Sequence, residues 1–192
     1  MAFHNRLTKK LKGVMFLEVQ KDSSSERALE EIMDAYGEEV KRLIFSYIKE
    51  WNITDDLTQD TFLSVYLHLD SFQSKSKLRT WIYSIAINKC KDYLKSWKYK
   101  KVIVTNKFFG INQTTNRSPS KWIEEKESKD ELIEKVLQLP TKYREPILLY
   151  YFQYFTITEI SEITKIKAST IKTRIHRAKK LLRVELEGDI DE

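Results

Sequence analysis

The chain has 192 residues and a formal net charge of +6, and 41% of its residues are hydrophobic, which is enough apolar material for one large domain or two small ones. It contains only four glycines and three prolines, which disfavours β-sandwiches and glycine-rich nucleotide-binding folds because both need many tight turns. The single cysteine, Cys90, excludes a disulfide within the chain. No apolar run is long enough for a signal peptide or a membrane span. We therefore expect an all-helical cytoplasmic protein whose positive charge favours an anionic partner, nucleic acid first.

Residues 26–101 are expected to form an N-terminal helical bundle. Apolar residues recur at helical spacing in three segments, 26–50, 54–69 and 78–97. Ser25 is a suitable start for the first helix, and Thr54 or Asp55 can cap the second. The third helix is predicted to turn one face inward, made of Trp81, Ile82, Ile85, Ala86, Tyr93 and Leu94. Residues 1–25 have two interpretations, a basic amphipathic arm or an unstructured extension.

Residues 102–128 lack sustained periodicity and contain Gly110 and the Ser118-Pro119 pair, so we expect a flexible linker, with a weak strand candidate at 102–104. Four short helices are predicted after it, at 129–138, 142–153, 157–164 and 168–186. The acidic residues 187–192 are predicted to be a solvated terminus. The expected fold is therefore all-α, with two small helical domains joined by a linker, the C-terminal domain spanning residues 129–186.

The last two predicted helices have the lengths and spacing of a helix-turn-helix module. Thr156 can cap the first of them, and Glu159 completes a capping box three residues later. A short turn, residues 164–167, leads to the second helix. The apolar stripe of that helix consists of Ile171, Ile175, Ala178 and Leu182.

Residues 165–183 contain eight lysines or arginines and no acid. A solvated amphipathic helix would usually mix both signs of charge, so an unbroken cationic face favours a polyanion with a groove, which is duplex DNA. The N-terminal end of such a helix faces the base edges, which predicts base or nearby phosphate contacts for Ser169, Thr170, Lys172, Thr173 and Arg174. Backbone contacts are predicted for Arg177, Lys179 and Lys180.

Two further motifs lie in the N-terminal half. The first is an acidic and amide-bearing block made of Asp56, Gln59 and Asp60, with Phe62 beside it. Paired carboxylates can bind a metal or serve acid–base catalysis, but no second carboxylate cluster accompanies them and His68 is the only histidine nearby. Docking of a basic partner protein is the more economical interpretation. We therefore expect no catalytic residue, no metal and no cofactor.

The second motif interleaves lysines with aromatic residues. Six lysines accompany one acid, Asp92, between residues 89 and 101, and Tyr93, Trp97 and Tyr99 lie among them. Cations for phosphates beside aromatic faces for stacking suit single-stranded or melted nucleic acid. The competing interpretation places Trp81, Ile82, Ile85 and Tyr93 in the core. We accept it for most of them and retain the lysines and Tyr99 as functional candidates.

These blocks, in this order, resemble the extracytoplasmic-function (ECF) sigma factors of bacterial RNA polymerase over about residues 28–185. The family pattern D-x-x-Q-[DE]-x-F is matched by Asp56, Gln59, Asp60 and Phe62. The pattern W-[IL]-Y-x-I-A-x-N is matched by Trp81 through Asn88. The pattern L-P-x-x-x-[RQ]-x-[VIP] is matched by Leu139, Pro140 and Arg144. The pattern E-I-[AS]-E-I, followed by T-[VI]-K-[ST]-R-[LI]-x-R-[AG], is matched by Glu159, Ile160 and Thr170 through Ala178.

The resemblance implies an alternative sigma factor with three binding surfaces. The acidic block, including Phe62, would bind the clamp helices of the polymerase β′ subunit. The segment 78–101 and its preceding loop would melt and read the promoter −10 element, through Lys89, Lys91, Asp92, Lys95, Lys98, Tyr99, Lys100 and Lys101. The helix-turn-helix would read the −35 element. Implied partners are the β′ and β subunits of core polymerase, promoter DNA and an anti-sigma protein, which in some cases is membrane-bound.

Two departures from the family pattern stand out. The turn that is usually L-G-I-P reads Thr164-Lys165-Ile166-Lys167, so a non-glycine residue in a left-handed turn costs on the order of 1 kcal/mol, while Lys165 gains access to a phosphate. Asp92 stands where relatives commonly have Asn, and an acid there changes the expected −10 preference.

The alternative from a nearby class is a conventional helix-turn-helix regulator with an N-terminal effector or interaction domain. It predicts a pocket within residues 26–97 and duplex binding without polymerase. An enzyme is disfavoured because the chain has no glycine-rich phosphate loop, no G-x-S-x-G motif and three scattered histidines.

Overall fold

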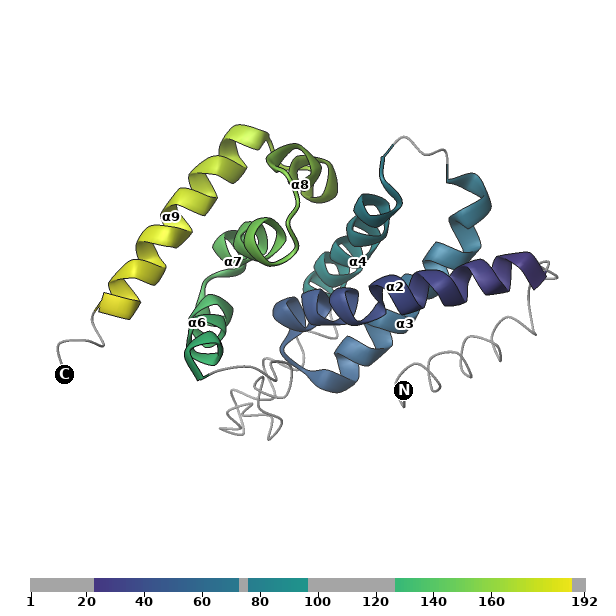
Figure 1. Ribbon diagram of the computed structural model, residues 1–192, viewed down its shortest axis with the longest axis horizontal. Coiled ribbons are helices and arrows are strands. Elements are labelled where there is room, and N and C mark those ends of the chain that lie inside the picture. Colours follow the sequence, from purple (N-terminus) through teal and green to yellow (C-terminus); the bar gives the residue numbers. More distant parts are fainter. Residues whose placement is uncertain (1–22, 73–75, 97–126, 188–192) are drawn as a thin grey trace. The chain divides into compact units, whose positions relative to one another are not determined.

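The computed structural model describes residues 23–72, 76–96 and 127–187, and their regular structure is entirely helical (Figure 1). The chain divides into two compact units, one within residues 1–105 and the other within 106–192. The prediction of two small all-α domains is therefore confirmed. The N-terminal extension up to residue 22, the linker up to residue 126, the strand candidate at 102–104 and the tail from residue 188 lie outside the described residues.

The first unit is a three-helix bundle in which each helix packs against the other two. Its elements are α2 (Ser23–Ile48), α3 (Trp51–His68), a 3₁₀ turn η1 (Leu69–Ser71) and α4 (Leu78–Lys95). Its fully buried side chains include Val40, Ile44, Phe62, Val65, Tyr66, Ile82 and Tyr83.

Helix α3 begins three residues before the predicted cap. Lys49 takes a left-handed conformation (φ 58°) and turns the chain sharply after α2. The Glu50 carboxylate then accepts hydrogen bonds from the backbone N–H groups of Asn52 and Ile53, at 2.9 and 2.8 Å. The prediction that Thr54 or Asp55 caps this helix is wrong, because a carboxylate outside the four usual capping types satisfies the first N–H groups.

Helix α4 is rotated relative to the predicted inward face. Ile82 and Ala86 are buried as expected, but Tyr83, Ile87 and Cys90 complete the buried stripe. Trp81 and Ile85, together with Tyr93 and Leu94, are only half-buried. The reason is that α4 packs against both α2 and α3, so its contact face follows the groove between them.

A polar network between α2 and α4 supports this rotation. Glu39 on α2 accepts hydrogen bonds from Arg79 and from the Tyr83 hydroxyl, each at 2.9 Å. Burial, together with the neighbouring Glu39 charge, raises the pKa of Tyr83 well above its usual range. Tyr83 therefore faces the core as a neutral donor to the Glu39 carboxylate.

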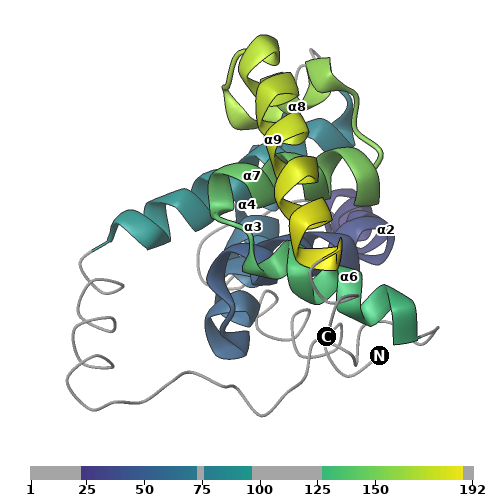
Figure 2. The same ribbon diagram turned by 90° about the vertical axis from the view of Figure 1, so that its left-hand side faces the viewer.

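The second unit contains four helices, as predicted, with one irregular turn. They are α6 (Glu127–Gln138), α7 (Thr141–Ile147) continued by a π-helical turn η3 (Leu148–Phe152), α8 (Ile157–Thr164) and α9 (Ala168–Glu187). Pro146 lies inside α7 and has no N–H to bond the preceding turn, and the wider π-helical turn follows it. Helix α7 packs across α9, and α8 packs beside the N-terminal part of α9 (Figure 2).

Arg144 explains why the segment after Leu139-Pro140 carries an arginine. Its side chain is 4% exposed, and it donates to the carbonyls of Leu137 (2.6 Å) and Leu139 (3.1 Å) and to the Thr141 hydroxyl (3.2 Å). These carbonyls end α6 without helical partners, so the guanidinium of the next helix caps α6 from inside the unit.

Candidate nucleic-acid interface

The helix-turn-helix forms through local interactions that were visible in the sequence. The Thr156 hydroxyl accepts from the Glu159 backbone N–H, and the Glu159 carboxylate accepts from the Thr156 N–H, which confirms the capping box. The turn passes through Lys165 in the left-handed conformation (φ 59°, ψ 29°). The Ser161 hydroxyl donates to the Ile166 carbonyl at 2.7 Å and closes the turn. The strained, non-glycine turn is thus confirmed.

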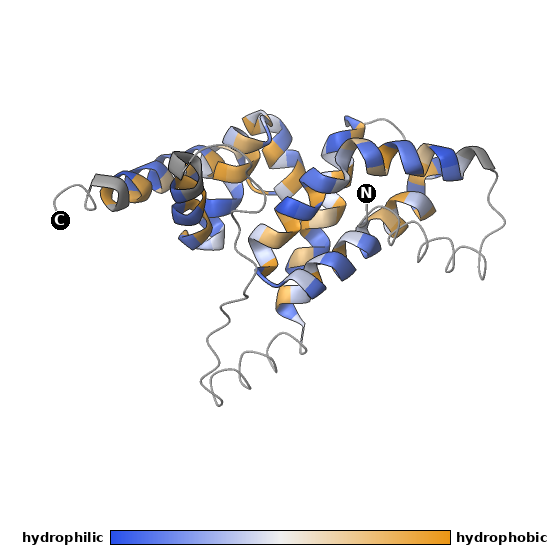
Figure 3. Cartoon of the chain, turned by 60° about the horizontal axis from the view of Figure 1, so that its bottom comes forward, coloured by the Kyte–Doolittle hydropathy of each residue, from blue (hydrophilic) through white to orange (hydrophobic). Residues whose placement is uncertain are grey.

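Helix α9 separates an apolar face from a cationic one, as its hydropathy shows (Figure 3). Ile171, Ile175, Ala178 and Leu182 are at most 9% exposed, so the predicted stripe is confirmed. Most of the predicted DNA contacts are exposed, namely Lys165, Ser169, Lys172, Thr173, Arg177, Lys179 and Lys180. Thr170 and Arg174 are half-buried.

Helical geometry ranks these residues. Lys172, Thr173 and Lys180 lie opposite the buried stripe, whereas Arg174 follows Ile171 by three positions and flanks the stripe. His176 is exposed at the centre of the cationic face, and the sequence analysis did not select it. Its spacing of three and four residues from Thr173, Lys172 and Lys180 is the signal that identifies it.

The acidic block lies on α3, but its members differ in exposure. Asp56 and Asp60 are exposed and Gln59 is half-exposed, whereas Phe62 is fully buried in the bundle. Phe62 therefore anchors α3 and offers no ring to a partner. The neighbouring Asp55 pairs with Lys41 at 2.6 Å.

Leucine side chains extend the exposed side of α3, which the sequence analysis missed. Leu63 is half-exposed and Leu67 is 46% exposed. Both follow Asp56 and Asp60 at helical spacing, so acidic and apolar groups share one exposed face. We call Asp56, Asp60, Leu63 and Leu67 the α3 face.

The lysine and aromatic segment is described only in part. On α4, Lys89 and Lys91 are half-exposed, and Asp92 and Lys95 are exposed. The remaining predicted contacts, Lys98, Tyr99, Lys100 and Lys101, lie outside the described residues.

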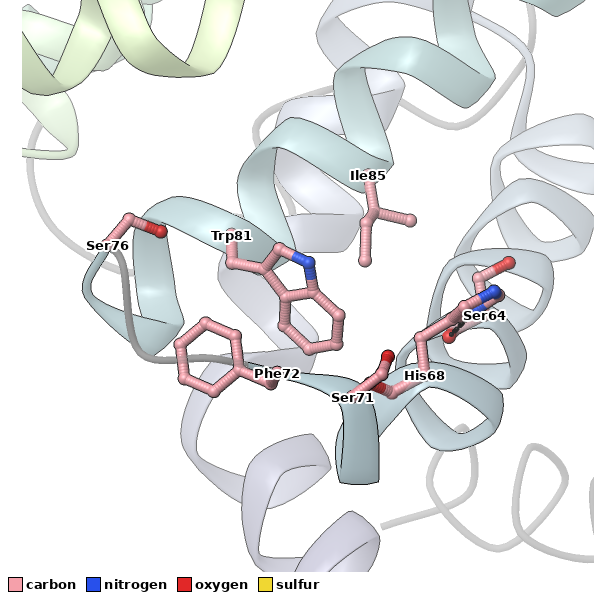
Figure 4. Close-up of a pocket in the computed structure, with 7 residues that line it drawn as sticks. All are labelled: Ser64, His68, Ser71, Phe72, Ser76, Trp81 and Ile85. Atoms are coloured by element: carbon pink, nitrogen blue, oxygen red, sulfur yellow. Dashed lines mark hydrogen bonds between the residues drawn. The ribbon is translucent and has the colours of Figure 1, made fainter.

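A pocket of about 470 Å³ opens where the end of α3 approaches the start of α4 (Figure 4). Its lining residues are Ser64, His68, Ser71, Phe72, Ser76, Trp81 and Ile85. The rings of Phe72 and Trp81 lie with their centroids 4.9 Å apart at 31°. The sequence analysis assigned Trp81 and Ile85 to the core, and the rotation of α4 brings them here instead.

The polar side of this pocket has defined hydrogen-bonding character. His68 Nδ1 lies 2.8 Å from the Ser64 carbonyl oxygen. Because a carbonyl only accepts, Nδ1 carries the proton, and Nε2 of the neutral imidazole is an acceptor. Aromatic faces beside hydroxyl and imidazole groups match what an unstacked nucleobase offers, a π-face and a polar edge.

Other site types find less support. Among the residues that the structure describes, no group of three or more His, Cys, Asp or Glu side chains could hold a metal ion. Within the same residues, no helix is both long and apolar enough to cross a membrane.

Comparison with known proteins agrees with both units. The family model for Sigma-70 region 2 matches residues 32–98, and the model for Sigma-70, region 4 matches residues 129–182. The ECF RNA polymerase sigma factor SigW of Bacillus subtilis (strain 168) is 30% identical over 167 residues, covering 83% of this chain and 89% of that protein. SigM of the same organism is 31% identical over 156 residues, covering 81% and 93%.

Two solved structures share the fold. The sigma factor RpoE in complex with the anti-sigma factor NepR from Bartonella quintana has a TM-score of 0.68 at 19% identity, covering 84% of this chain and 98% of that one. The structure of CnrH in complex with the cytosolic domain of CnrY has a TM-score of 0.60 at 19% identity, covering 97% and 99%.

Proposed function

Since this chain belongs to the ECF sigma factors of the sigma-70 family, and is thus an alternative sigma factor that directs transcription initiation by bacterial RNA polymerase, we propose that three of its surfaces divide the work. The family matches cover both units, so a conventional helix-turn-helix regulator is not favoured, although its predicted pocket exists in the first unit. The observation that carries the proposal is the pairing of an acidic α3 face with a cationic α9.

The α3 face binds core polymerase. Exposed Asp56 and Asp60 supply charge for a basic partner helix, and Leu67 supplies apolar area that leaves water on binding. Gln59 adds a hydrogen-bonding amide at the edge. The β′ clamp helices are the partner, and the second unit contacts the β subunit.

The pocket and α4 together bind the melted −10 element. An unpaired base stacks on Trp81 or Phe72 and meets His68 and the serine hydroxyls with its polar edge. The lysines of α4, with those at 98–101, follow the phosphates of the same strand. Exposed Asp92 can accept only from a donor such as the amino group of cytosine.

Helix α9 binds the −35 element in the major groove. Lys172 and Thr173, with His176, face the base edges, and Lys179, Lys180 and Lys165 contact phosphates. Half-buried Arg174 reaches the groove wall from the flank of the helix.

Regulation and location follow the relatives. Solved structures of RpoE and CnrH contain anti-sigma partners, NepR and CnrY. We extend this to an anti-sigma partner for this chain, which acts in the cytoplasm, carries no catalysis of its own and needs no cofactor.

Reconstitution with core polymerase tests the proposal. Purified full chain plus bacterial core enzyme should start transcripts at specific promoters, and start-site mapping recovers both promoter elements. Asp60→Arg should lower the affinity for core polymerase by roughly tenfold to a hundredfold, since an exposed acid is replaced by a charge that repels a basic partner. Glu31→Arg, the same charge change at an exposed position of α2, serves as the matched control.

Two results would contradict the proposal. One is a well-folded chain that does not bind core polymerase. The other is equal loss of binding in the Asp60 and Glu31 variants, which would reduce the α3 face to a general charge effect.

A further inference from the structure

A cluster of donors joins α7 to α9 outside the helix-turn-helix turn. The Tyr143 hydroxyl of α7 is hydrogen-bonded to Arg177 of α9, and Lys142 Nζ lies 4.9 Å from the centroid of the Tyr143 ring. The hydrogen bond from Arg177, followed by the charge of Lys142, lowers the pKa of Tyr143. Both charged groups that act on this phenol are therefore cations.

The hydrogen-bonding capacity of the cluster points outward. At neutral pH the phenol keeps its proton, so its oxygen accepts from the Arg177 guanidinium while its own O–H can donate to a further acceptor. Guanidinium and ammonium groups only donate. Three side chains thus offer hydrogen bonds to one anion, and a phosphate with several acceptor oxygens satisfies them best.

The position of Arg177 brings this cluster to DNA. Arg177 is exposed on α9 and follows Thr173 by four residues, so the two lie on one side of the helix. Lys142 is also exposed, and Tyr143 is half-exposed. The cluster therefore extends the cationic face of α9 onto α7.

Preorganisation distinguishes this arginine from its neighbours. An exposed lysine or arginine loses rotamer freedom when it binds a phosphate, which weakens its net contribution. Arg177 is held by the hydroxyl of a side chain with only two rotatable bonds before its ring. Less freedom remains to be lost when the phosphate arrives.

We propose that Lys142, Tyr143 and Arg177 bind one backbone phosphate of the upstream promoter element, with Tyr143 as a positioning residue for Arg177. This inference rests on the proposed binding of that element by α9. It adds a contact from α7 that neither the helix-turn-helix pattern nor the family match assigns.

The test uses polymerase holoenzyme containing the full chain and a promoter fragment recovered by start-site mapping. Tyr143→Phe keeps the ring and removes the hydroxyl, and should weaken promoter binding roughly threefold to tenfold. The same substitution in an Arg177→Ala background should have no further effect, because Tyr143 acts through Arg177. Tyr151→Phe, which removes a hydroxyl from another exposed tyrosine of the unit, should bind like the wild type.

Single methylphosphonate substitutions in the upstream element identify the phosphate. Neutralising one particular phosphate should lower the slope of log affinity against log salt by about one. On that DNA, Tyr143→Phe and Lys142→Ala should each have no effect. Thermal unfolding of each variant verifies that the second unit stays folded.

The outcomes separate the two proposals. If the wild type fails to start specific transcripts, the proposed function fails. If the wild type initiates but Tyr143→Phe binds as tightly as Tyr151→Phe, or its loss persists without Arg177, the phosphate cluster is refuted while the sigma-factor function stands.

Discussion

Replacement of Lys165 by glycine should stabilise the second unit and weaken DNA binding at once. Lys165 ends α8 in a left-handed conformation (φ 59°), with its N–H bonded to the Ser161 carbonyl at 3.0 Å. A side chain in that conformation costs about 1–2 kcal/mol, which glycine avoids. The greater freedom of glycine in the unfolded chain returns about 0.5–1 kcal/mol.

The net gain is therefore about 0.5–1 kcal/mol, which corresponds to a rise in Tm of roughly 2–8 °C for a unit of this size. Thermal unfolding of the full chain by circular dichroism measures it. The matched control is Lys167→Gly in the same turn, an exposed lysine whose φ is not positive. That change adds unfolded-state freedom without relief of strain and should lower Tm.

The same variant tests the contact of Lys165 with a phosphate. Loss of one phosphate contact should lower the salt slope of promoter binding by about one, although the protein is more stable. A Lys165→Gly protein that melts no higher than the Lys167→Gly control would refute the account of strain in this turn. An unchanged salt slope would remove Lys165 from the DNA contacts.

Three further predictions concern other parts of the structure. Arg144→Met should destabilise the second unit by roughly 2–4 kcal/mol in urea unfolding, because the carbonyls that end α6 lose a buried charged donor; a change below about 1 kcal/mol would contradict that role. Trp81→Ala should slow promoter opening by the equivalent of about 1–3 kcal/mol of stacking while binding of closed duplex is unchanged, and a premelted −10 fragment that fails to rescue opening would argue against a stacking role. Tyr83 keeps its proton in the folded chain at a pH where the unfolded chain begins to lose it, so stability of the first unit should be full below about pH 10 and fall above it; Tyr83→Phe should flatten this dependence, and an unaltered alkaline profile would contradict the assignment.

Much of the second unit was predictable because its determinants are local. The capping box of Thr156 and Glu159 involves residues three positions apart, and the apolar stripe of α9 follows from helical spacing alone. The strained turn at Lys165 was also readable, since the module needs a left-handed residue and the chain offers no glycine there. The cationic face of α9 follows in the same way, because a helix that buries one stripe must expose the other.

The tertiary structure decided which side of each N-terminal helix is buried. Trp81 and Ile85 fit the predicted inward face equally well, and only the groove between α2 and α3 turned them toward the pocket instead. Phe62 belongs to a motif with polar neighbours, yet packing placed it fully in the core. Neighbouring positions on an apolar helix differ by small rotations, and these are set by the partner helices rather than by spacing.

Long-range polar contacts were likewise beyond the sequence pattern. Arg144 was visible as a motif residue, but its capping of α6 depends on how α6 and α7 meet. The Tyr143–Arg177 pair depends on α7 crossing α9. The sequence by itself therefore determined the helices, the helix-turn-helix and its charged face, because these arise from neighbours within one or two turns. Only the tertiary structure decided the pocket, the α3 face and the α7–α9 phosphate cluster, because each joins side chains from elements whose relative rotation is set by packing.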